Sequence, residues 1–486
     1  MPSSPAPHRP LVLRGVSVVS TADGTHGPAV DVSVRDGVIT AISASSSGPA
    51  DPFAVVVDAP GRFVVPGYVD AHAHPLPASG PIPASALGLM LANGITGFRQ
   101  MSGSAGLLAR RRAGTLGLPA DAPDLLALPG ALLTPMNAGS SAAAIAAVRE
   151  QHAAGADFVK AAAIAPQPYF DAQAEANRLG IPVLGHLPAG IDVRAAARSG
   201  FRSIEHLGPG VTMLVSCSCD QHGLGEAVAA AKSGVKIPSV RLPLPAGLTM
   251  RLMSRIVRKL VVNPTNRSRP VDIELLRRGV DTFDADDAAE LAADLTAAGV
   301  WQCPTLIRMR AQQLCDAAEF RDDPNLTYMS RATIREWTAA AARFRTFSAA
   351  ERATLRAVYE LLLRLTRIFD QAGAKMLTGT DAVGAAWVVP GFSLHREFAE
   401  LASAGLRPLR VLQMTTLDPA EFFGTSSTMG SVEVGKKADL VVLDADPMDG
   451  VASLGRIHAV IHGGRLYSST DLADIKNRIA AGSPAR

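Results

Sequence analysis

The chain has 486 residues, of which 48% are hydrophobic and 19% charged, which is typical of a globular protein with a large core and excludes a disordered or fibrous chain. The net charge of +3 and the 5% of aromatic residues do not indicate a nucleic-acid binder. Four cysteines are too few for a disulfide framework, and the start MPSSPAPHRP lacks the apolar region of a secretory signal. We therefore expect a cytoplasmic protein that binds neither nucleic acid nor membrane.

The two chain ends share one pattern. From residue 10 to about residue 65, short valine-rich runs are separated by Gly, Asp and Pro, which predicts strands. The same pattern returns near the other end in ADLVVLDADP and IHAVIHGGRLYSS. Chain termini often lie close together in compact proteins. We therefore predict that residues 1–65 and 425–486 form one small β-sandwich domain.

The middle of the chain alternates differently. Eight short apolar runs between Tyr68 and Asp381 are separated by stretches with helical spacing, which predicts an α/β fold, most simply a (β/α)₈ TIM barrel over residues 66–424. The runs are GYVDAHAH, GITGFRQM, PGALLTP, ADFVKAAAI, IPVLGHL, RSIEHL, WQCPTLI and AKMLTGTD.

One interval is too long for this repeat. The 94 residues between His206 and Trp301 exceed the roughly 20 to 30 that a crossover helix needs, so we predict an insertion over about 211–280. Within it, residues 241–278 hold nine basic side chains against two acidic ones. The insertion and the long helical interval 309–374 are candidate caps over the mouth of the barrel.

Potential metal ligands follow the predicted strands. His72 and His74 end the first run, and alternate strand residues point the same way, so both imidazoles can face one point. Further candidates end later runs, where barrel enzymes place their chemistry; they are Lys160, His186, His206 and Asp381. Imidazole and carboxylate ligands suit zinc, and also manganese, cobalt or iron.

Lys160 needs a separate explanation, because an ammonium group cannot bind a metal ion. It could be a half-buried lysine at the rim of the barrel. Alternatively, its neutral amine reacts with CO₂ to give a carbamate whose two oxygens bridge two metal ions. A nearby cationic site lowers the lysine pKa and so favours the neutral amine. We favour the carbamate.

These motifs resemble the amidohydrolase superfamily of metal-dependent hydrolases, in its imidazolonepropionase-like and prolidase-like branch, which is related to ochratoxin-hydrolysing amidases. The resemblance rests on VPGYVDAHAH, GADFVKAAAI, PVLGHLPAG, SIEHLGPG and MLTGTDAVG. Three departures are Gln100 where the family usually has Asp, AAAIAPQPYF after Lys160, and LPAG after His186. These departures leave the substrate-binding residues unassigned.

The resemblance implies a binuclear centre. His72, His74 and Asp381 would hold one divalent ion, His186 and His206 the second, and carboxylated Lys160 would bridge two Zn²⁺ ions. A bridging hydroxide would attack a small-molecule substrate, and Asp381 would move the proton to the leaving amine. We expect cleavage of an amide in an N-acyl amino acid or dipeptide-like substrate, by a homo-oligomer. The alternatives are a lactone, carbamate or cyclic amide at the same site, or a non-catalytic scaffold.

Overall fold

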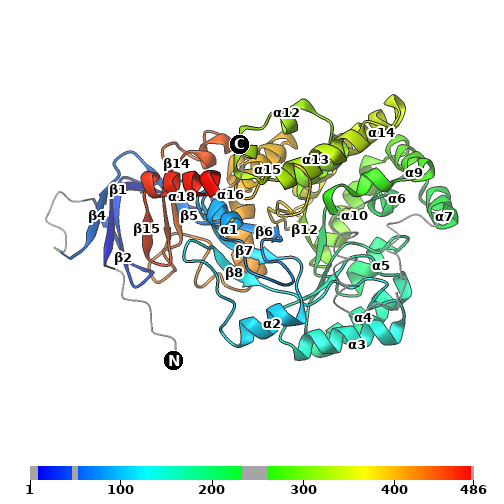
Figure 1. Cartoon of the computed structure of the whole chain (residues 1–486), viewed down its shortest axis with the longest axis horizontal. Coiled ribbons are helices and arrows are strands. Elements are labelled where there is room, and N and C mark those ends of the chain that lie inside the picture. Colours follow the sequence, from blue (N-terminus) through cyan, green and yellow to red (C-terminus); the bar gives the residue numbers. More distant parts are fainter. Residues whose placement is uncertain (1–8, 46–52, 209, 232–260, 483–486) are drawn as a thin grey trace.

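The computed structural model describes residues 9–45, 53–208, 210–231 and 261–482. Figure 1 shows strands from both chain ends together at one end of the molecule, and helices around further strands in the rest of it. The predicted mixed α/β class is confirmed. Residues 232–260, which include much of the basic part of the expected insertion, lie outside the described residues. No helix among the described residues is long and apolar enough to cross a membrane.

Both chain ends contribute to one eight-stranded sheet. Strand β5 (Phe63–Pro66) pairs in parallel with β1 (Leu11–Val18) and antiparallel with β13 (Leu440–Leu443), where Leu440 lies opposite Pro66. Apolar side chains from both ends form one buried core, as their alternation indicates. The remaining strands of the sheet are β2 (Val30–Arg35), β3 (Val38–Ala44), β4 (Val55–Asp58), β14 (Ile457–His462) and β15 (Arg465–Tyr467).

His462 connects this sheet to the loop before β8. Its Nδ1 lies 2.8 Å from Asp439 Oδ1, and its Nε2 lies 3.1 Å from the carbonyl oxygen of Ala122. Both partners accept hydrogen bonds, so only the charged imidazolium satisfies both. Burial opposes the charge, but the hydrogen bond and charge of Asp439 outweigh it and raise the pKa of His462 above its ordinary value.

This pair predicts a pH-dependent stability. A raised folded pKa stabilises the fold below the unfolded pKa of about 6.5, and the contribution is lost as the pH rises through the folded pKa. We therefore expect His462→Gln to lower the melting temperature of chelator-treated protein at pH 5.5 more than at pH 8.5. Replacement of the exposed His152 by Gln is the control. An equal loss at both pH values would contradict the charged pair.

Seven short parallel strands form two further sheets. One contains β6 (Tyr68–Ala73), β7 (Ile95–Gln100) and β8 (Asp124–Ala127), and the other contains β9 (Val159–Ala161), β10 (Val183–Gly185), β11 (Ser203–Glu205) and β12 (Trp301–Cys303). Isolated parallel bridges join Leu133 to Ala161, Gln302 to Met376, and Ala73 to Ala382. These bridges extend the pairing beyond the edge strands of both sheets.

Two of the eight predicted strands differ from the structure. The third was expected in PGALLTP, but β8 precedes it, and only Leu133 of that run forms a bridge. Pro129 lacks an N–H group and interrupts strand pairing there. The eighth run, AKMLTGTD, contributes single bridges and backbone hydrogen bonds, such as that from Ala71 N to Thr378 O, but no named strand.

Helices lie between the parallel strands and around them (Figure 1). Two of them, α10 (Ala285–Ala297) and α15 (Phe392–Ser403), are each followed by a glycine, at positions 299 and 405. The others are α1 (Ala84–Leu91), α2 (Ala105–Arg112), α3 (Ser141–Ala153), α4 (Pro166–Leu179), α5 (Val193–Arg198), α6 (Thr212–Ser216), α7 (Gln221–Ala231), α9 (Pro270–Asp281), α11 (Leu306–Gln313), α12 (Ala318–Arg321), α13 (Arg331–Phe344), α14 (Ala349–Gln371), α16 (Pro408–Thr415), α17 (Leu417–Phe422) and α18 (Ser469–Gly482), with short 3₁₀ turns η1 (Pro264–Arg267), η2 (Pro324–Tyr328) and η3 (Val451–Gly455).

The two predicted cap segments pack on each other. Buried side chains from the described part of the insertion, among them Leu276 in α9, form one core with Trp337 in α13 and Val358 in α14. The same core contains Ala382 and Trp387 from the loop that follows Asp381. The two candidate cap segments are therefore anchored beside a predicted metal ligand.

Candidate metal centre

The six residues predicted as metal ligands lie in one cluster at the carboxyl ends of the parallel strands. His72 Nε2 lies 3.2 Å from Asp381 Oδ1 and 3.2 Å from Lys160 Nζ. The ring of His206 lies 4.6 Å from that of His72 between centroids, and the ring of His186 lies 5.1 Å from that of His206. His74 completes the set, with Nε2 2.9 Å from Asp381 Oδ1.

Asp381 lies at the centre of this cluster. One carboxylate oxygen faces both His72 and His74, and the side chain is 9% exposed. Burial favours the neutral acid, but hydrogen bonds to these two histidines and their charge outweigh it and hold the pKa of Asp381 well below its ordinary value. Asp381 is therefore an ionised carboxylate among imidazole nitrogens, as a divalent cation requires.

Hydrogen bonds fix the protonation of two histidine rings. The Thr305 hydroxyl donates to the carbonyl oxygen of Pro304 at 2.8 Å, so it accepts from His206 Nδ1 at 2.5 Å. A carbonyl oxygen can only accept, so His186 Nδ1 donates to Ala162 at 3.2 Å. In both neutral rings the lone pair is therefore on Nε2. Proteins usually orient a metal-binding histidine by a hydrogen bond from the ring nitrogen that does not bind the metal, and here that nitrogen is Nδ1.

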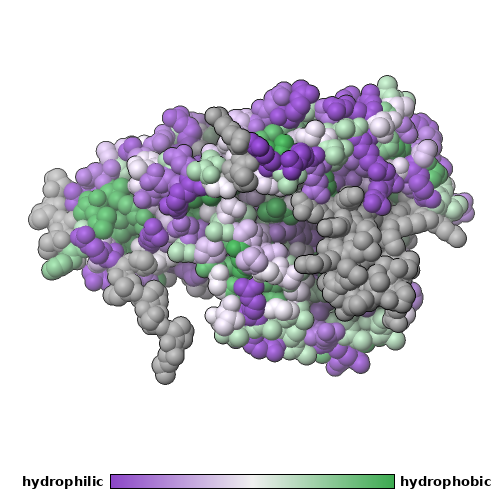
Figure 2. All heavy atoms as spheres, viewed as in Figure 1, coloured by the Kyte–Doolittle hydropathy of each residue, from purple (hydrophilic) through white to green (hydrophobic). Residues whose placement is uncertain are grey.

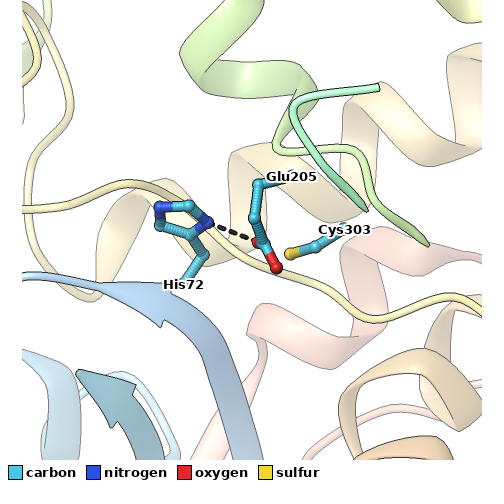
Figure 3. Close-up of side chains that lie close together, drawn as sticks. All are labelled: His72, Glu205 and Cys303. Carbon is cyan, nitrogen blue, oxygen red and sulfur yellow. Dashed lines mark hydrogen bonds and ion pairs between the residues drawn. The ribbon is translucent and has the colours of Figure 1, made fainter. Parts of the chain in front are cut away.

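His72 is oriented by a buried carboxylate (Figure 3). Its Nδ1 donates to Glu205 Oε2 at 2.6 Å, and Glu205 Oε1 accepts from Arg99 at 2.8 Å. Burial raises the pKa of Glu205, but the charges of Arg99 and His72 outweigh burial and lower it to about 2. The remaining nitrogen of His72, Nε2, faces Asp381 and Lys160.

A second group of potential ligands lies behind His72. His72, Glu205 and Cys303 have donor atoms within 4.8 Å of one another, and the thiol lies beside the carboxylate (Figure 3). Burial raises the pKa of Cys303 well above its ordinary value, so the thiol stays protonated. Glu205 is already bound to Arg99, His72 and Ser203. This group therefore supports His72 rather than forming a separate metal site.

Three of the histidines are neutral near physiological pH. Burial lowers the pKa of His74 to about 4 and that of His186 to about 3, and it holds the pKa of His206 well below its ordinary value. Metal ions bind neutral imidazole, so the environment favours the form that a ligand needs.

Lys160 is buried inside the cluster. Burial lowers its pKa to about 8, although the charges of Asp381 and Glu205 oppose this effect. The lowered pKa increases the fraction of neutral amine at neutral pH, and the neutral amine is the form that carboxylation by CO₂ requires. This environment is compatible with the carbamate and differs from the solvated rim lysine that was the alternative.

The backbone of the cluster is strained at three positions. His206, Asp381 and Thr305 have φ angles of 59°, 61° and 46°, in a region that costs non-glycine residues roughly 1–2 kcal/mol each. Such strain is typical of functional sites. Close packing also requires Gly379, because a Cβ there would lie 2.6 Å from the Cβ of His72.

Arg308 was not predicted from the sequence, yet it contacts a predicted ligand. Its Nε donates to Asp381 Oδ2 at 2.8 Å, and its side chain is 5% exposed. Arg308 stands in the first turn of α11, immediately after β12, and therefore at the same strand ends as the ligands. An arginine in the first turn of a helix carries no distinctive sequence signal, which is why it was missed.

We expect Arg308→Gln to destabilise the protein in the absence of metal. The substitution leaves the buried Asp381 carboxylate without its cation, which costs about 3 kcal/mol or more. The measurement is the free energy of unfolding of chelator-treated protein, with Arg331→Gln on the exposed side of α13 as the control. If the two variants were equally stable, the ion pair would contribute nothing to the fold.

Gln100, which the sequence singled out, and His395 have structural partners. Gln100 Oε1 accepts from Leu76 N at 3.1 Å, while its Nε2 donates to Leu76 O and to Ser102 O. Because Ser102 Oγ lies 2.8 Å from His74 Nδ1, Gln100 holds the loop that orients His74. His395 packs at the start of α15, with Nε2 3.0 Å from the carbonyl oxygen of Asn93, and does not belong to the cluster.

Comparisons with known proteins indicate the family that this chain resembles. Residues 362–467 match the model of the Amidohydrolase family. A D-hydantoinase of Streptomyces coelicolor is 38% identical over 65 residues, which are 13% of this chain and 13% of that protein. A solved bottromycin amidohydrolase is 25% identical, with a TM-score of 0.68 over 99% of this chain and 92% of the other. These findings support the amidohydrolase superfamily.

Two more distant structures show the fold alone. A protein from Bifidobacterium longum described as a prolidase is 20% identical, with a TM-score of 0.58 over 98% of this chain and 100% of that one. The A. niger ochratoxinase is 14% identical, with a TM-score of 0.59 over 96% and 97%. The predicted resemblance to the amidohydrolase superfamily is confirmed by the family model and the bottromycin amidohydrolase, and these two structures add only a shared fold.

Proposed function

We propose that the chain is a metal-dependent hydrolase that cleaves an amide C–N bond in an N-acyl amino acid or dipeptide-like small molecule. The observation that carries the proposal is the convergence of four histidines, Asp381 and Lys160 at the strand ends. The names of the structural neighbours, an amidohydrolase, a prolidase and an ochratoxinase, support the choice of bond.

The proposal includes a closed (β/α)₈ barrel over residues 66–424. The bridges at Leu133, Met376 and Ala382 support closure, because they extend the parallel pairing at both edges of the two short sheets. Residues 1–65 and 425–486 would form the terminal β-sandwich, and residues 211–280 the insertion. The eight-stranded sheet built from both ends supports the terminal domain.

The donor set fits two divalent ions, for which zinc is our first choice. His72, His74 and Asp381 would hold one ion, and His186 and His206 the other. Lys160, after carboxylation by CO₂, would supply an oxygen to each. When bound, the ions would lower the pKa of water and polarise the scissile carbonyl.

The side chains themselves would move one proton. Asp381 is ionised, so its carboxylate would accept a proton from the attacking water and pass it to the leaving amine nitrogen. Arg308 holds the other carboxylate oxygen and fixes the orientation of the group. Glu205 and Thr305 hold the rings of His72 and His206.

A panel of substrates with one acyl group and different leaving groups tests the bond type. On protein reconstituted with zinc and bicarbonate, we expect the N-acyl amino acid to be cleaved with the highest kcat/KM. Faster cleavage of the lactone, carbamate or cyclic amide would replace the proposed bond. No cleavage of any member would contradict a hydrolase and favour the scaffold.

A further inference from the structure

A cavity of about 710 Å³ adjoins the candidate metal centre. His74, whose Nε2 contacts Asp381 and whose side chain is 17% exposed, is one of its lining residues, and so is Val383, two residues after Asp381. Cavities of roughly 300–1,000 Å³ bind ligands of drug size. In the space-filling view the surface is hollowed beside α18, and apolar residues are visible there (Figure 2).

The wall of this cavity is largely apolar. Five prolines line it, at positions 75, 77, 83, 119 and 390, together with aliphatic side chains from α1 and α18. Within the described residues, the charged lining side chains are Asp121 and Arg478, which are 3.1 Å apart, and Arg478 is 66% exposed. The pair therefore belongs to the rim, and the inner wall offers apolar surface and neutral hydroxyl groups.

One side of the wall comes from the C-terminal helix. Ile475 and Ile479 of α18 line the cavity and also pack against α1. A Cβ at Gly88 in α1 would lie 3.3 Å from both isoleucines, so glycine permits this close approach. Buried Leu472 and Ile475 hold the helix against Leu91. Helix α18 is thus a fixed part of the wall.

We propose that this cavity binds a large, uncharged, apolar acyl group of the substrate, and that α18 sets the size of the group. The inference rests on the proposed function, because it assumes an amide substrate. It places the acyl side of the scissile amide toward α18. The carboxylate of an amino-acid leaving group would lie elsewhere, since the cavity has no unpaired cationic side chain in its described inner wall.

The test measures binding of the N-methyl amides of acetic, hexanoic and decanoic acid by calorimetry to chelator-treated full-length protein. Burial of each methylene increases affinity a few-fold, so we expect the decanoyl amide to bind at least about tenfold more tightly than the hexanoyl amide. Ile479→Trp fills the cavity and should lower the ratio of decanoyl to acetyl affinity at least about tenfold. Asn477→Trp introduces the same residue on the exposed side of α18 and should leave the ratio unchanged.

A second variant distinguishes filling of the cavity from misfolding caused by a change in α18. Ser85→Trp fills the cavity from the exposed start of α1 and should change the ratio in the same direction. The inference is overturned if affinity does not depend on chain length, or if Asn477→Trp matches both cavity variants. Because binding needs no turnover, a chain-length preference without amide hydrolysis would contradict only the proposed function. Amide hydrolysis without the preference would contradict only the cavity inference.

Discussion

Asp381→Asn should lower kcat/KM for amide hydrolysis by about 10³-fold or more. The amide cannot take up a proton as the carboxylate does, and general-base groups contribute roughly 10²–10⁴-fold. The substitution also removes an anionic metal ligand, and with it the charged partner of Arg308, His72 and His74. Steady-state kinetics on protein reconstituted with zinc and bicarbonate, across pH 6 to 9, measure the effect.

Asp439→Asn is the matched control. Asp439 is also a largely buried aspartate paired with a histidine, but it belongs to the terminal sheet. We expect this variant to lose stability and keep kcat/KM within about threefold. If Asp381→Asn retained more than a tenth of the wild-type kcat/KM, Asp381 would be neither the proton carrier nor an essential ligand.

Lys160→Ala should remove most of the bound metal. Without the amine no carbamate forms, so the two ions lose a shared ligand. They also lose the negative charge that would offset the repulsion between them. We expect fewer than about one ion per chain and a fall in kcat/KM of at least about 100-fold. Propionate should restore part of the activity, because a small carboxylate fits the space vacated by the lysine side chain and supplies two oxygens.

Lys375→Ala provides the comparison, because Lys375 is half exposed and paired with Glu421. It should keep the wild-type metal content and show no response to propionate. Full metal content in Lys160→Ala would leave Lys160 an ordinary buried amine and contradict the carbamate.

Much of the candidate site could be predicted because ligand residues follow strands at regular intervals. His72, His186, His206 and Asp381 each come directly after or at the end of an apolar run, and parallel strands bring such positions to one edge. Their partners were harder to predict. Glu205 precedes His206 in a run of apolar residues, and a carboxylate in a buried strand is a usable signal that was overlooked. Arg308 reaches the cluster because of the direction in which α11 leaves β12, and Thr305 because of its left-handed backbone conformation. The sequence pattern predicts neither.

The fold was predictable to a similar degree. The valine alternation at both ends reflects a sheet with one buried face, and the structure joins both ends in that sheet. The third strand was predicted at the wrong place because the sequence offers two short apolar runs there, DLLA at 124–127 and ALL at 131–133. Tertiary contacts with β7 select the first, while the turn at Pro129 leaves the second with a single bridge.

Elemental mass spectrometry of the protein purified without chelator tests the central claim most directly, since it counts metal ions per chain. The proposed donor set predicts about two divalent ions per chain. One ion would indicate a mononuclear centre in which Lys160 stays an amine, and would contradict the bridged pair. No bound metal, even after reconstitution with zinc and bicarbonate, would contradict the metal-dependent hydrolase itself.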